Sequence, residues 1–282
     1  MFVAWAHLPR VQFELVKTEL PFSFTLGRLL MKVRPAPVAS LIKRLLRIRR
    51  VEITTTEGRF WVDPASDPGI SLASAGIYDP ATLGAIRRLL GPGDTFIDLG
   101  ANEGYFTVVA SRLVGPKGRV LAVEPQLRLE PVLSRNLLLN GCANVTHIRA
   151  AVSDHRGMSV LHLTPDMNNA ASGLAAPTRY RIATQPTPLI TLADLLALAP
   201  PGPPPVLKMD IESFEHEAIH GSESVFREGA VRALILEIHV DMLRKRQLDI
   251  EAVPRLLRAC GYEQLPRFSG LVWAKPGISF PA

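Results

Sequence analysis

Residues 95–124, TFIDLGANEGYFTVVASRLVGPKGRVLAVE, decide the fold of this chain. Residues 95–99 form a short apolar run typical of a buried strand, and residues 105–114 repeat apolar side chains at helical spacing. The glycine turn at residues 100–104 joins them, because glycine adopts unusual backbone dihedrals without a steric penalty. A second apolar run at residues 120–123 completes the pattern. We interpret the stretch as the first half of a βαβ nucleotide-binding unit.

Two glycines and two carboxylates in this stretch indicate the ligand. Gly100 and Gly104 have the spacing G-x-x-x-G, which differs from the dinucleotide fingerprint G-x-G-x-x-G. Asp98 would repel a pyrophosphate but suits a cationic amino group, and Glu124 closes a strand where an acid accepts hydrogen bonds from ribose hydroxyls. S-adenosylmethionine has a ribose, a positive end and no phosphate. An ordinary core turn without a ligand is the alternative interpretation.

The composition excludes several classes of protein. The chain has 282 residues, of which 47% are hydrophobic, and this is enough for one large domain with an extension. Cys142 and Cys260 provide neither a disulfide framework nor metal-ligand spacing, so we expect a cytoplasmic protein. No stretch of the sequence reaches the ~18 uninterrupted apolar residues of a membrane span.

The basic charge is concentrated near the N-terminus. Residues 1–50 carry ten Lys or Arg and two acids, a net charge of +8, whereas residues 51–282 have a net charge of −2. We therefore predict a basic helical extension at 1–50 and a catalytic domain at 51–282. The apolar residues expected on one face of a helix at 38–50 are Val38, Leu41, Ile42, Leu45 and Leu46. We expect this face to pack on the domain or on a second subunit of a homo-oligomer, covering part of the acceptor entrance.

Two other partners of residues 1–50 were weighed. A basic amphipathic helix can also make peripheral contact with an anionic membrane. No aromatic residues interleave with the charges of 38–50, which argues against a single-stranded nucleic-acid platform. We therefore expect no nucleic-acid partner.

The rest of the chain alternates strands with helices, which predicts a mostly parallel sheet covered on both faces. A hairpin is expected at 51–62 and a long loop, typical of a lid or binding loop, at 164–188. The further strands are predicted at 145–151, 160–163, 206–210, 233–238 and 271–274, and the further helices at 81–90, 126–140, 191–198 and 250–260.

Polar side chains follow two of the later strands. Asp210 and Glu212 come after the strand at 206–210, and Glu237 and His239 lie at the end of the strand at 233–238. Ligands of open parallel sheets bind at the carboxyl ends of strands, so we expect these four groups to share one crevice with the glycine turn. Each has a plain structural alternative, such as a helix cap for Asp210.

Four segments of the chain carry a resemblance to a known family. FIDLGANEGYF, AVEPQ, AAVSDHRG and LKMDIESFEHEAIHG are similar in order and spacing to the FkbM family of S-adenosylmethionine-dependent methyltransferases, over residues 76–240. One departure is Ser213, where the family usually has glycine. The resemblance implies a Rossmann-like class I methyltransferase fold with a seven-stranded type of sheet. It also implies O-methylation of a hydroxyl on a small natural product or sugar.

The resemblance also implies roles for individual residues. His239 is the first candidate for the general base, with Glu237 or Glu212 orienting it, and Asp210 faces the methyl group that is transferred. The residues expected to bind the cofactor are Asp98, Gly100, Asn102, Gly104, Tyr105, Phe106, Glu124, Pro125, Ala151, Val152, Asp154 and Asp210.

Rival interpretations concern the metal and the function. No metal ligands are assigned, but a divalent cation held by Asp210, Glu237 and His239 is the rival mechanism. A nicotinamide-dependent oxidoreductase is one alternative function, which the missing G-x-G-x-x-G disfavours. A noncatalytic scaffold that binds a membrane or a partner through residues 1–50 is the other.

Overall fold

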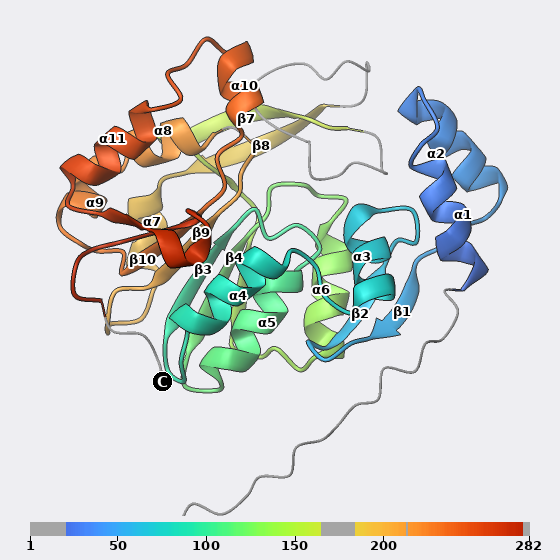
Figure 1. Ribbon diagram of the computed structural model, residues 1–282, viewed down its shortest axis with the longest axis horizontal. Helices are drawn as coiled ribbons and strands as arrows, with labels where there is room; N and C mark the ends of the chain where they lie inside the picture. The colour runs from blue at the N-terminus through green and yellow to red at the C-terminus, as the bar shows by residue number, and fades with distance from the viewer. Residues whose placement is uncertain (1–20, 165–183, 213, 279–282) are drawn as a thin grey trace, which may run out of the picture.

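Seven strands form the central sheet, and the glycine turn follows an inner strand at its carboxyl end. The computed structural model describes residues 21–164, 184–212 and 214–278. The strand order is β11-β12-β10-β9-β3-β4-β5, and only β12 runs antiparallel to its neighbours (Figure 1). The strands are β3 (Thr95–Leu99), β4 (Arg119–Val123), β5 (Val145–Ile148), β9 (Val206–Met209), β10 (Ala233–Leu236), β11 (Glu263–Leu265) and β12 (Val272–Ala274). The predicted α/β class and the mostly parallel seven-stranded sheet are confirmed.

Helices cover both faces of this sheet. Successive strand residues point to opposite faces, so Phe96 enters one hydrophobic core and Ile97 enters the other. Helices α4 and α5 supply the first core, and α7, α8, α9 and α11 supply the second. The bounds are α4 (Pro80–Leu89), α5 (Tyr105–Val114), α6 (Glu130–Leu139), α7 (Leu192–Ala197), α8 (Glu215–His220), α9 (Glu223–Arg227) and α11 (Ala252–Ala259).

The chain reverses its direction of travel across the sheet at β3. From β3 the chain proceeds to β4 and β5 on one side, and later returns to β9 and β10 on the other. A crevice opens at the carboxyl ends of the strands at such a switch point. The turn after β3 and the residues that follow β4, β9 and β10 therefore converge there.

A small second sheet corrects two predictions. The strand predicted at 145–151 divides into β5 and β6 (Ala151–Val152), and β6 belongs to a sheet of order β6-β8-β7. The strand expected at 160–163 is confirmed as part of β7 (Gly157–His162), which pairs antiparallel with β8 (Thr184–Ile190). The loop prediction for 164–188 was therefore wrong at its end, and residues 165–183 lie outside the described residues.

Prolines explain why β8 was missed. Pro186 and Pro188 cannot donate backbone hydrogen bonds, so they suggest a loop. In the structure both pair with β7, opposite Val160 and Met158, while the contact with β6 is confined to Leu189 and Ile190.

Most remaining elements follow the sequence, with four additions. The hairpin of β1 (Val51–Thr54) and β2 (Arg59–Val62) is confirmed. Helix α3 (Asp67–Ala75), helix α9, helix α10 (Val240–Lys245) and strand β11 were not predicted. The strand predicted at 233–238 ends at Leu236, so His239 lies at the start of α10 instead of on a continued strand.

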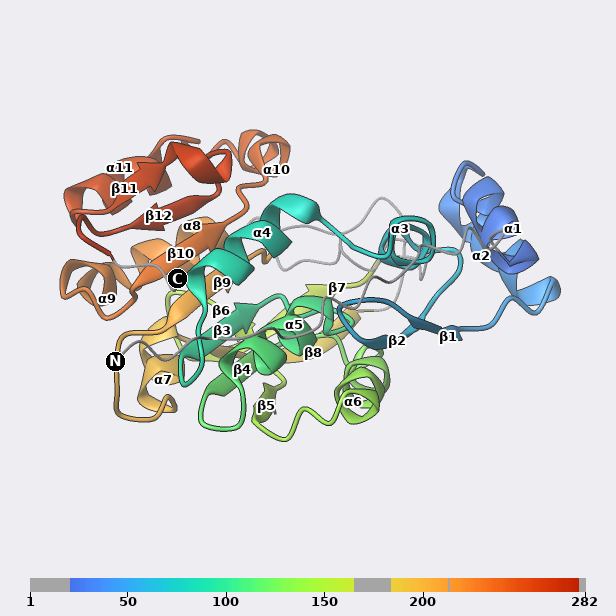
Figure 2. The ribbon, with the colours of Figure 1, turned by 60° about the horizontal axis from the view of Figure 1, so that its bottom comes forward.

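The N-terminal extension contains two helices, α1 (Phe22–Leu30) and α2 (Ala36–Leu45), which we call the α1–α2 hairpin. It lies at one end of the molecule beside β1 and β2, in both views (Figures 1 and 2). Phe24 enters the core that also holds Phe60, and Leu30 and Ala39 pack around Ala65. An ion pair between Lys43 and Asp63 adds a second anchor.

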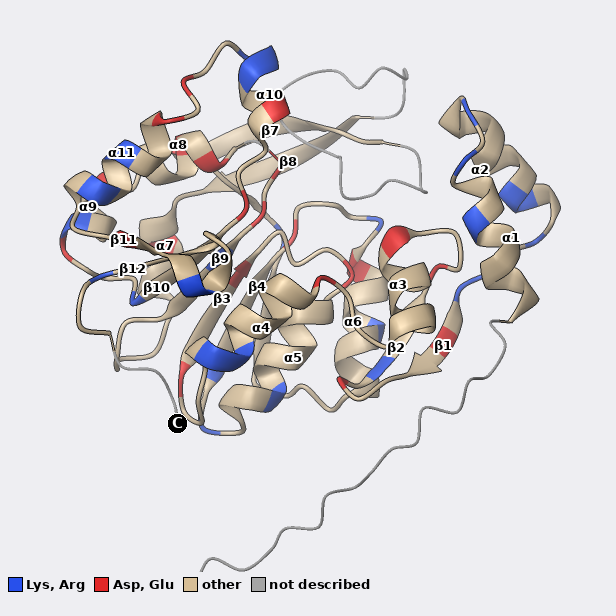
Figure 3. Ribbon diagram, in the orientation of Figure 1, with Lys and Arg blue, Asp and Glu red and all other residues tan. Residues whose placement is uncertain are grey.

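Most of the apolar face predicted for 38–50 is exposed on the described chain, and Ile42 is its member that packs against Ala39 and Ala65. The expected packing on the catalytic domain is thus met only in part, and packing on a second subunit stays a prediction. We call the exposed apolar side chains of this hairpin the apolar patch, and each is between 43% and 80% exposed. The patch consists of Phe22, Leu29, Val38, Leu41, Leu45 and Leu46. Lys and Arg occur on both helices of the hairpin, and residues 21–50 contain no acid (Figure 3). None of the described helices is long and apolar enough to cross a bilayer.

Candidate functional site

Three residues with positive φ build the turn after β3. Gly100 has φ +79°, Asn102 has φ +50° and Gly104 has φ +87°. A Cβ on Gly100 would lie 1.9 Å from the backbone oxygen of Asp210, so only glycine lets this turn approach the end of β9. A Cβ on Gly104 would meet Leu133 of α6 instead. Gly100 therefore shapes the site, and Gly104 serves helix packing.

Glu124 is held at the end of β4 by two backbone amides. Its Oε2 accepts a hydrogen bond from the N–H of Asn102 at 2.9 Å, and its Oε1 accepts one from the N–H of Gln126 at 2.9 Å. Burial raises the pKa of Glu124 to about 6, although these hydrogen bonds oppose the shift. Each carboxylate oxygen has a further lone pair, so Glu124 can still accept hydrogen bonds from a ribose.

A pocket opens beside Glu124, at the carboxyl ends of β3, β4 and β9. Its lining is Gly100, Asn102, Val123, Glu124, Pro125, Gln126, Ala150, Ala151, Val152, Leu161, Asp210, Ile211, Glu212 and Phe214. The pocket has apolar walls and a few convergent polar groups, the usual character of a cofactor site. Eight residues that the sequence predicted for the site lie in this lining. The other six lining residues were not assigned to the site from the sequence: Val123, Gln126, Ala150, Leu161, Ile211 and Phe214.

Asp98 lies beneath the pocket and does not line it. Its carboxylate is fully buried, and its Oδ2 accepts a hydrogen bond from the hydroxyl of Thr107 at 2.6 Å. The Nζ of Lys208 lies 3.4 Å from Oδ1 of Asp98 and 3.8 Å from Oδ2 of Asp210. Burial opposes the charge of Lys208, but the two carboxylates keep its pKa above the usual value. Lys208 thus links the core to the site.

The remaining predicted cofactor residues also lie away from the pocket lining. Tyr105 and Phe106 are buried and pack against one another with ring centroids 5.1 Å apart, and Tyr78 contacts both. Asp154 is half exposed and pairs with His155. Ser213 lies outside the described residues.

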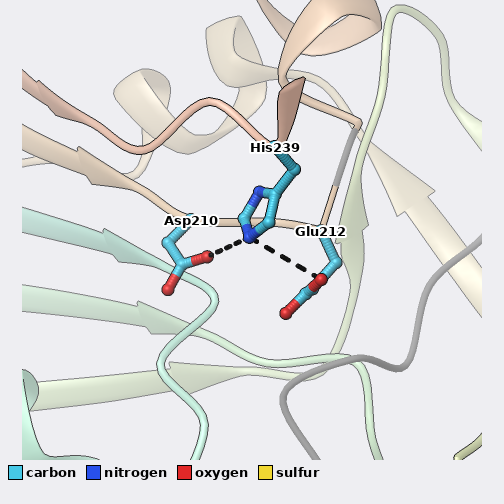
Figure 4. A group of neighbouring side chains, drawn as sticks. All are labelled: Asp210, Glu212 and His239. Carbon is cyan, nitrogen blue, oxygen red and sulfur yellow. Dashed lines mark ion pairs between the residues drawn. The ribbon is translucent and has the colours of Figure 1, made fainter. Parts of the chain in front are cut away.

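Three side chains converge beside the pocket, from the ends of β9 and β10. Nε2 of His239 lies 3.6 Å from Oδ1 of Asp210 and 3.7 Å from Oε2 of Glu212 (Figure 4). Asp210 and Glu212 also line the pocket, so the cluster borders it. We call these three residues the strand-end cluster.

Glu215 supports the cluster and was not assigned to the site from the sequence. Its side chain is 1% exposed, and its Oε1 lies 3.1 Å from Nδ1 of His239. The same oxygen accepts a hydrogen bond from the N–H of Ile211 at 3.2 Å. Glu215 is thus placed where it can orient the imidazole, a role for which the sequence suggested Glu237 or Glu212. The regular spacing of acids in D-x-E-S-x-E is the sequence signal for it.

The cluster perturbs the pKa values of its members. Burial raises the pKa of Glu212 to about 7, against the attraction of His239. Burial disfavours the charged form of His239, but the hydrogen bond to Glu215 and the surrounding carboxylates raise its pKa to about 9. The pKa of Glu237 is raised by burial and by Asp210. Perturbed groups beside a pocket are typical of functional sites.

Comparison with known proteins places this geometry in a family. The family model described as the methyltransferase FkbM domain matches residues 98–263, which is more than half of the chain. No curated protein matches the chain.

Solved structures show distant similarities. A methyltransferase FkbM from Methylobacillus flagellatus KT is 15% identical, with a TM-score of 0.39, over 82% of this chain and 53% of that one. Precorrin-6y C5,15-methyltransferase from Geobacter metallireducens GS-15 is 17% identical, with a TM-score of 0.37, over 66% of this chain and 74% of that one. A protein from Clostridium thermocellum, described as an rRNA methylase, is 28% identical, with a TM-score of 0.24. That match covers 25% of this chain and spans 38% of the other protein's length.

The family match includes the glycine turn, Glu124 and the strand-end cluster, all within residues 98–263. The chain therefore belongs to the FkbM methyltransferase family, and its cofactor is S-adenosylmethionine.

Proposed function

We propose that this chain transfers the methyl group of S-adenosylmethionine to a hydroxyl oxygen of a small acceptor molecule. The observation that carries the proposal is that two residues, Asp210 and Glu212, both line the pocket and belong to the strand-end cluster. A group that takes up charge or a proton thus borders the place where the methyl group is transferred.

The pocket suits the parts of the cofactor. Glu124 would accept hydrogen bonds from the ribose hydroxyls, and Ala151 and Val152 offer an apolar wall for the adenine. The turn at Gly100 and Asn102 would lie against the methionine end. Asp98 supports that turn through Thr107 and Lys208, which fits an indirect role better than contact with the amino group.

An oxygen acceptor fits the strand-end cluster for a chemical reason. A neutral hydroxyl is a weak nucleophile and must lose its proton as the new O–C bond forms. Groups that receive or stabilise that charge typically contribute about 10²–10⁴-fold in rate. Alignment of oxygen, methyl and sulfur supplies up to about 7–11 kcal/mol, so positioning is the larger contribution.

The test is methyl transfer from labelled donor. The full chain is incubated with methyl-labelled S-adenosylmethionine and a library of hydroxylated small molecules, and products are located by mass and by NMR. We expect the label on an acceptor oxygen, and Glu124→Gln should lose transfer through weaker cofactor binding. Label on nitrogen or carbon would contradict the oxygen assignment, and absence of cofactor binding would contradict the whole proposal.

A further inference from the structure

The strand-end cluster has a geometry that ion pairing alone explains poorly. The distances from Nε2 of His239 to Asp210 and Glu212, 3.6 and 3.7 Å, exceed those of hydrogen bonds. One ligand atom from each of the three residues lies within 4.8 Å of the other two. The donors therefore surround a common point without closing on one another (Figure 4).

These separations match those of ligands around a divalent cation. Metal bonds of about 2.1 Å place neighbouring ligand atoms about 3.0 Å apart at right angles, and about 3.4 Å apart in a tetrahedral arrangement. The two separations that involve Nε2 exceed the tetrahedral value by about 0.2–0.3 Å and the right-angle value by about 0.6–0.7 Å. The ligand oxygens of Asp210 and Glu212 lie within 4.8 Å of one another, so a bound cation would draw the three side chains inward.

Glu215 provides a second and independent observation. A histidine that binds a metal usually donates its other ring N–H to a carboxylate, which fixes the tautomer and the ring orientation. Nδ1 of His239 faces the buried Oε1 of Glu215 at 3.1 Å. Its Nε2 is thereby directed at Asp210 and Glu212.

We propose that Asp210, Glu212 and His239 bind one divalent cation. One imidazole and two carboxylates form a mixed nitrogen and oxygen set, which suits Mn²⁺ better than Ca²⁺, because Ca²⁺ takes six to eight oxygens. Glu212 replaces the Glu237 that was considered from the sequence. Glu215 is a positioning residue in this site.

The catalytic meaning of the cation rests on the proposed methyl transfer. A cation at this place would draw the acceptor oxygen to it and lower the pKa of its hydroxyl. The O–H bond breaks and its proton leaves to water, and the oxygen forms a bond to the methyl carbon. The C–S bond breaks at the same time, and its electron pair converts the sulfonium into a neutral thioether.

The test measures Mn²⁺ binding directly, without the reaction. Free Mn²⁺ is followed by electron paramagnetic resonance during titration of the full chain and of three variants. We expect His239→Ala to weaken binding more than tenfold and Glu215→Gln to weaken it by about 10–100-fold. The matched control is Glu217→Gln, on the same helix but paired with Arg246, which should bind Mn²⁺ as the unaltered chain does.

Two outcomes would overturn the proposal. In the first, the unaltered chain binds no Mn²⁺ at millimolar concentration. In the second, the His239→Ala variant binds Mn²⁺ with the same affinity as the unaltered chain. Glu215→Gln keeps the shape of the side chain, and thermal unfolding shows whether each variant is folded. Cofactor binding and methyl transfer are measured separately after chelation. Full turnover without metal would overturn the catalytic role of the cation and leave the proposed methyl transfer intact.

Discussion

The pocket edge of the sheet buries its charged and apolar side chains, whereas the α1–α2 hairpin exposes many of its own. At the sheet edge, Asp98, Glu124 and Lys208 are buried and partnered, and the apolar residues of the strands are covered on both faces. On the hairpin, the apolar patch is exposed and its flanking charges are all basic. The first region has its partners within the chain. The hairpin exposes an apolar surface that the described residues do not cover.

The largest effect should follow from breaking the charge pair beneath the pocket. Asp98→Asn keeps the shape of the side chain but leaves Lys208 buried beside a neutral group. Removing one partner of a buried ion pair costs about 3–5 kcal/mol, so we expect the free energy of unfolding to fall by that amount. Urea unfolding measures it.

The double variant Asp98→Asn with Lys208→Met is the control for this prediction, and it should recover part of the loss. Unchanged unfolding in Asp98→Asn would mean that Asp98 is not a structural group. A loss confined to cofactor affinity would return Asp98 to the role of binding the methionine amino group.

A substitution in the strand-end cluster should lower the rate of catalysis by a similar free energy. His239→Ala should lower turnover of the acceptor by about 10²–10⁴-fold and leave cofactor affinity nearly unchanged, because His239 does not line the cofactor pocket. Single-turnover kinetics and calorimetry measure the two quantities. Collapse of cofactor binding in this variant would show that His239 is structural.

A smaller effect should appear as a pH dependence of cofactor binding. The pKa of Glu124 is raised to about 6, so its charged form, which accepts hydrogen bonds from ribose best, is lost as pH falls through 6. Affinity should therefore decrease below pH 6. A hydrogen bond to a charged group contributes about 1.5–3 kcal/mol, so Glu124→Gln should weaken binding by about tenfold or more and remove the pH dependence. Calorimetry over pH 5–8 is the measurement.

The same carboxyl also predicts a change in stability. Its pKa is higher in the folded chain than its ordinary value of 4.5, because burial favours the protonated form. The stabilising contribution is therefore present at low pH and is lost as pH rises through 6. Without cofactor, the free energy of unfolding of the unaltered chain should fall as pH rises from 4.5 through 6, and this dependence should be absent in Glu124→Gln, whose side chain does not ionise. The same pH dependence in both proteins would contradict the assignment to Glu124.

The smallest effect is expected on the hairpin surface. Leu45→Ser changes a side chain that is 72% exposed, so the free energy of unfolding should change by less than about 0.5 kcal/mol. Phe24→Ala is the matched control, because Phe24 is fully buried and its loss should cost about 3–5 kcal/mol. A large loss in Leu45→Ser would show that another part of the chain or a second copy covers the apolar patch. Co-sedimentation with anionic vesicles, sensitive to salt, would identify a membrane instead.

The sequence allowed prediction of the parts of the site that are local in the chain. The turn at Gly100 and the acid at Glu124 lie within one strand-turn-helix-strand unit, so spacing alone places them. The partner of Asp98 could not be identified from the local sequence, because the register pairs Asp98 with Lys208 across β3 and β9. No local pattern contains that pairing.

The strand-end cluster shows the same limit. Its two acids and its histidine could be assigned to strand ends, but the partner of Nδ1 could not, because α10 begins where a continued strand was expected. Likewise, the helical spacing at Leu41 and Leu45 predicts an apolar face. It does not predict what lies against that face.

The approach of Gly100 to the backbone of Asp210 has a consequence for engineering. The turn after β3 and the end of β9 approach one another through main-chain atoms, with no side chain between them. Directed evolution therefore has no side chain to vary at this contact. Libraries that vary this pocket should keep Gly100 fixed and change Leu161 and Phe214, whose side chains line the pocket.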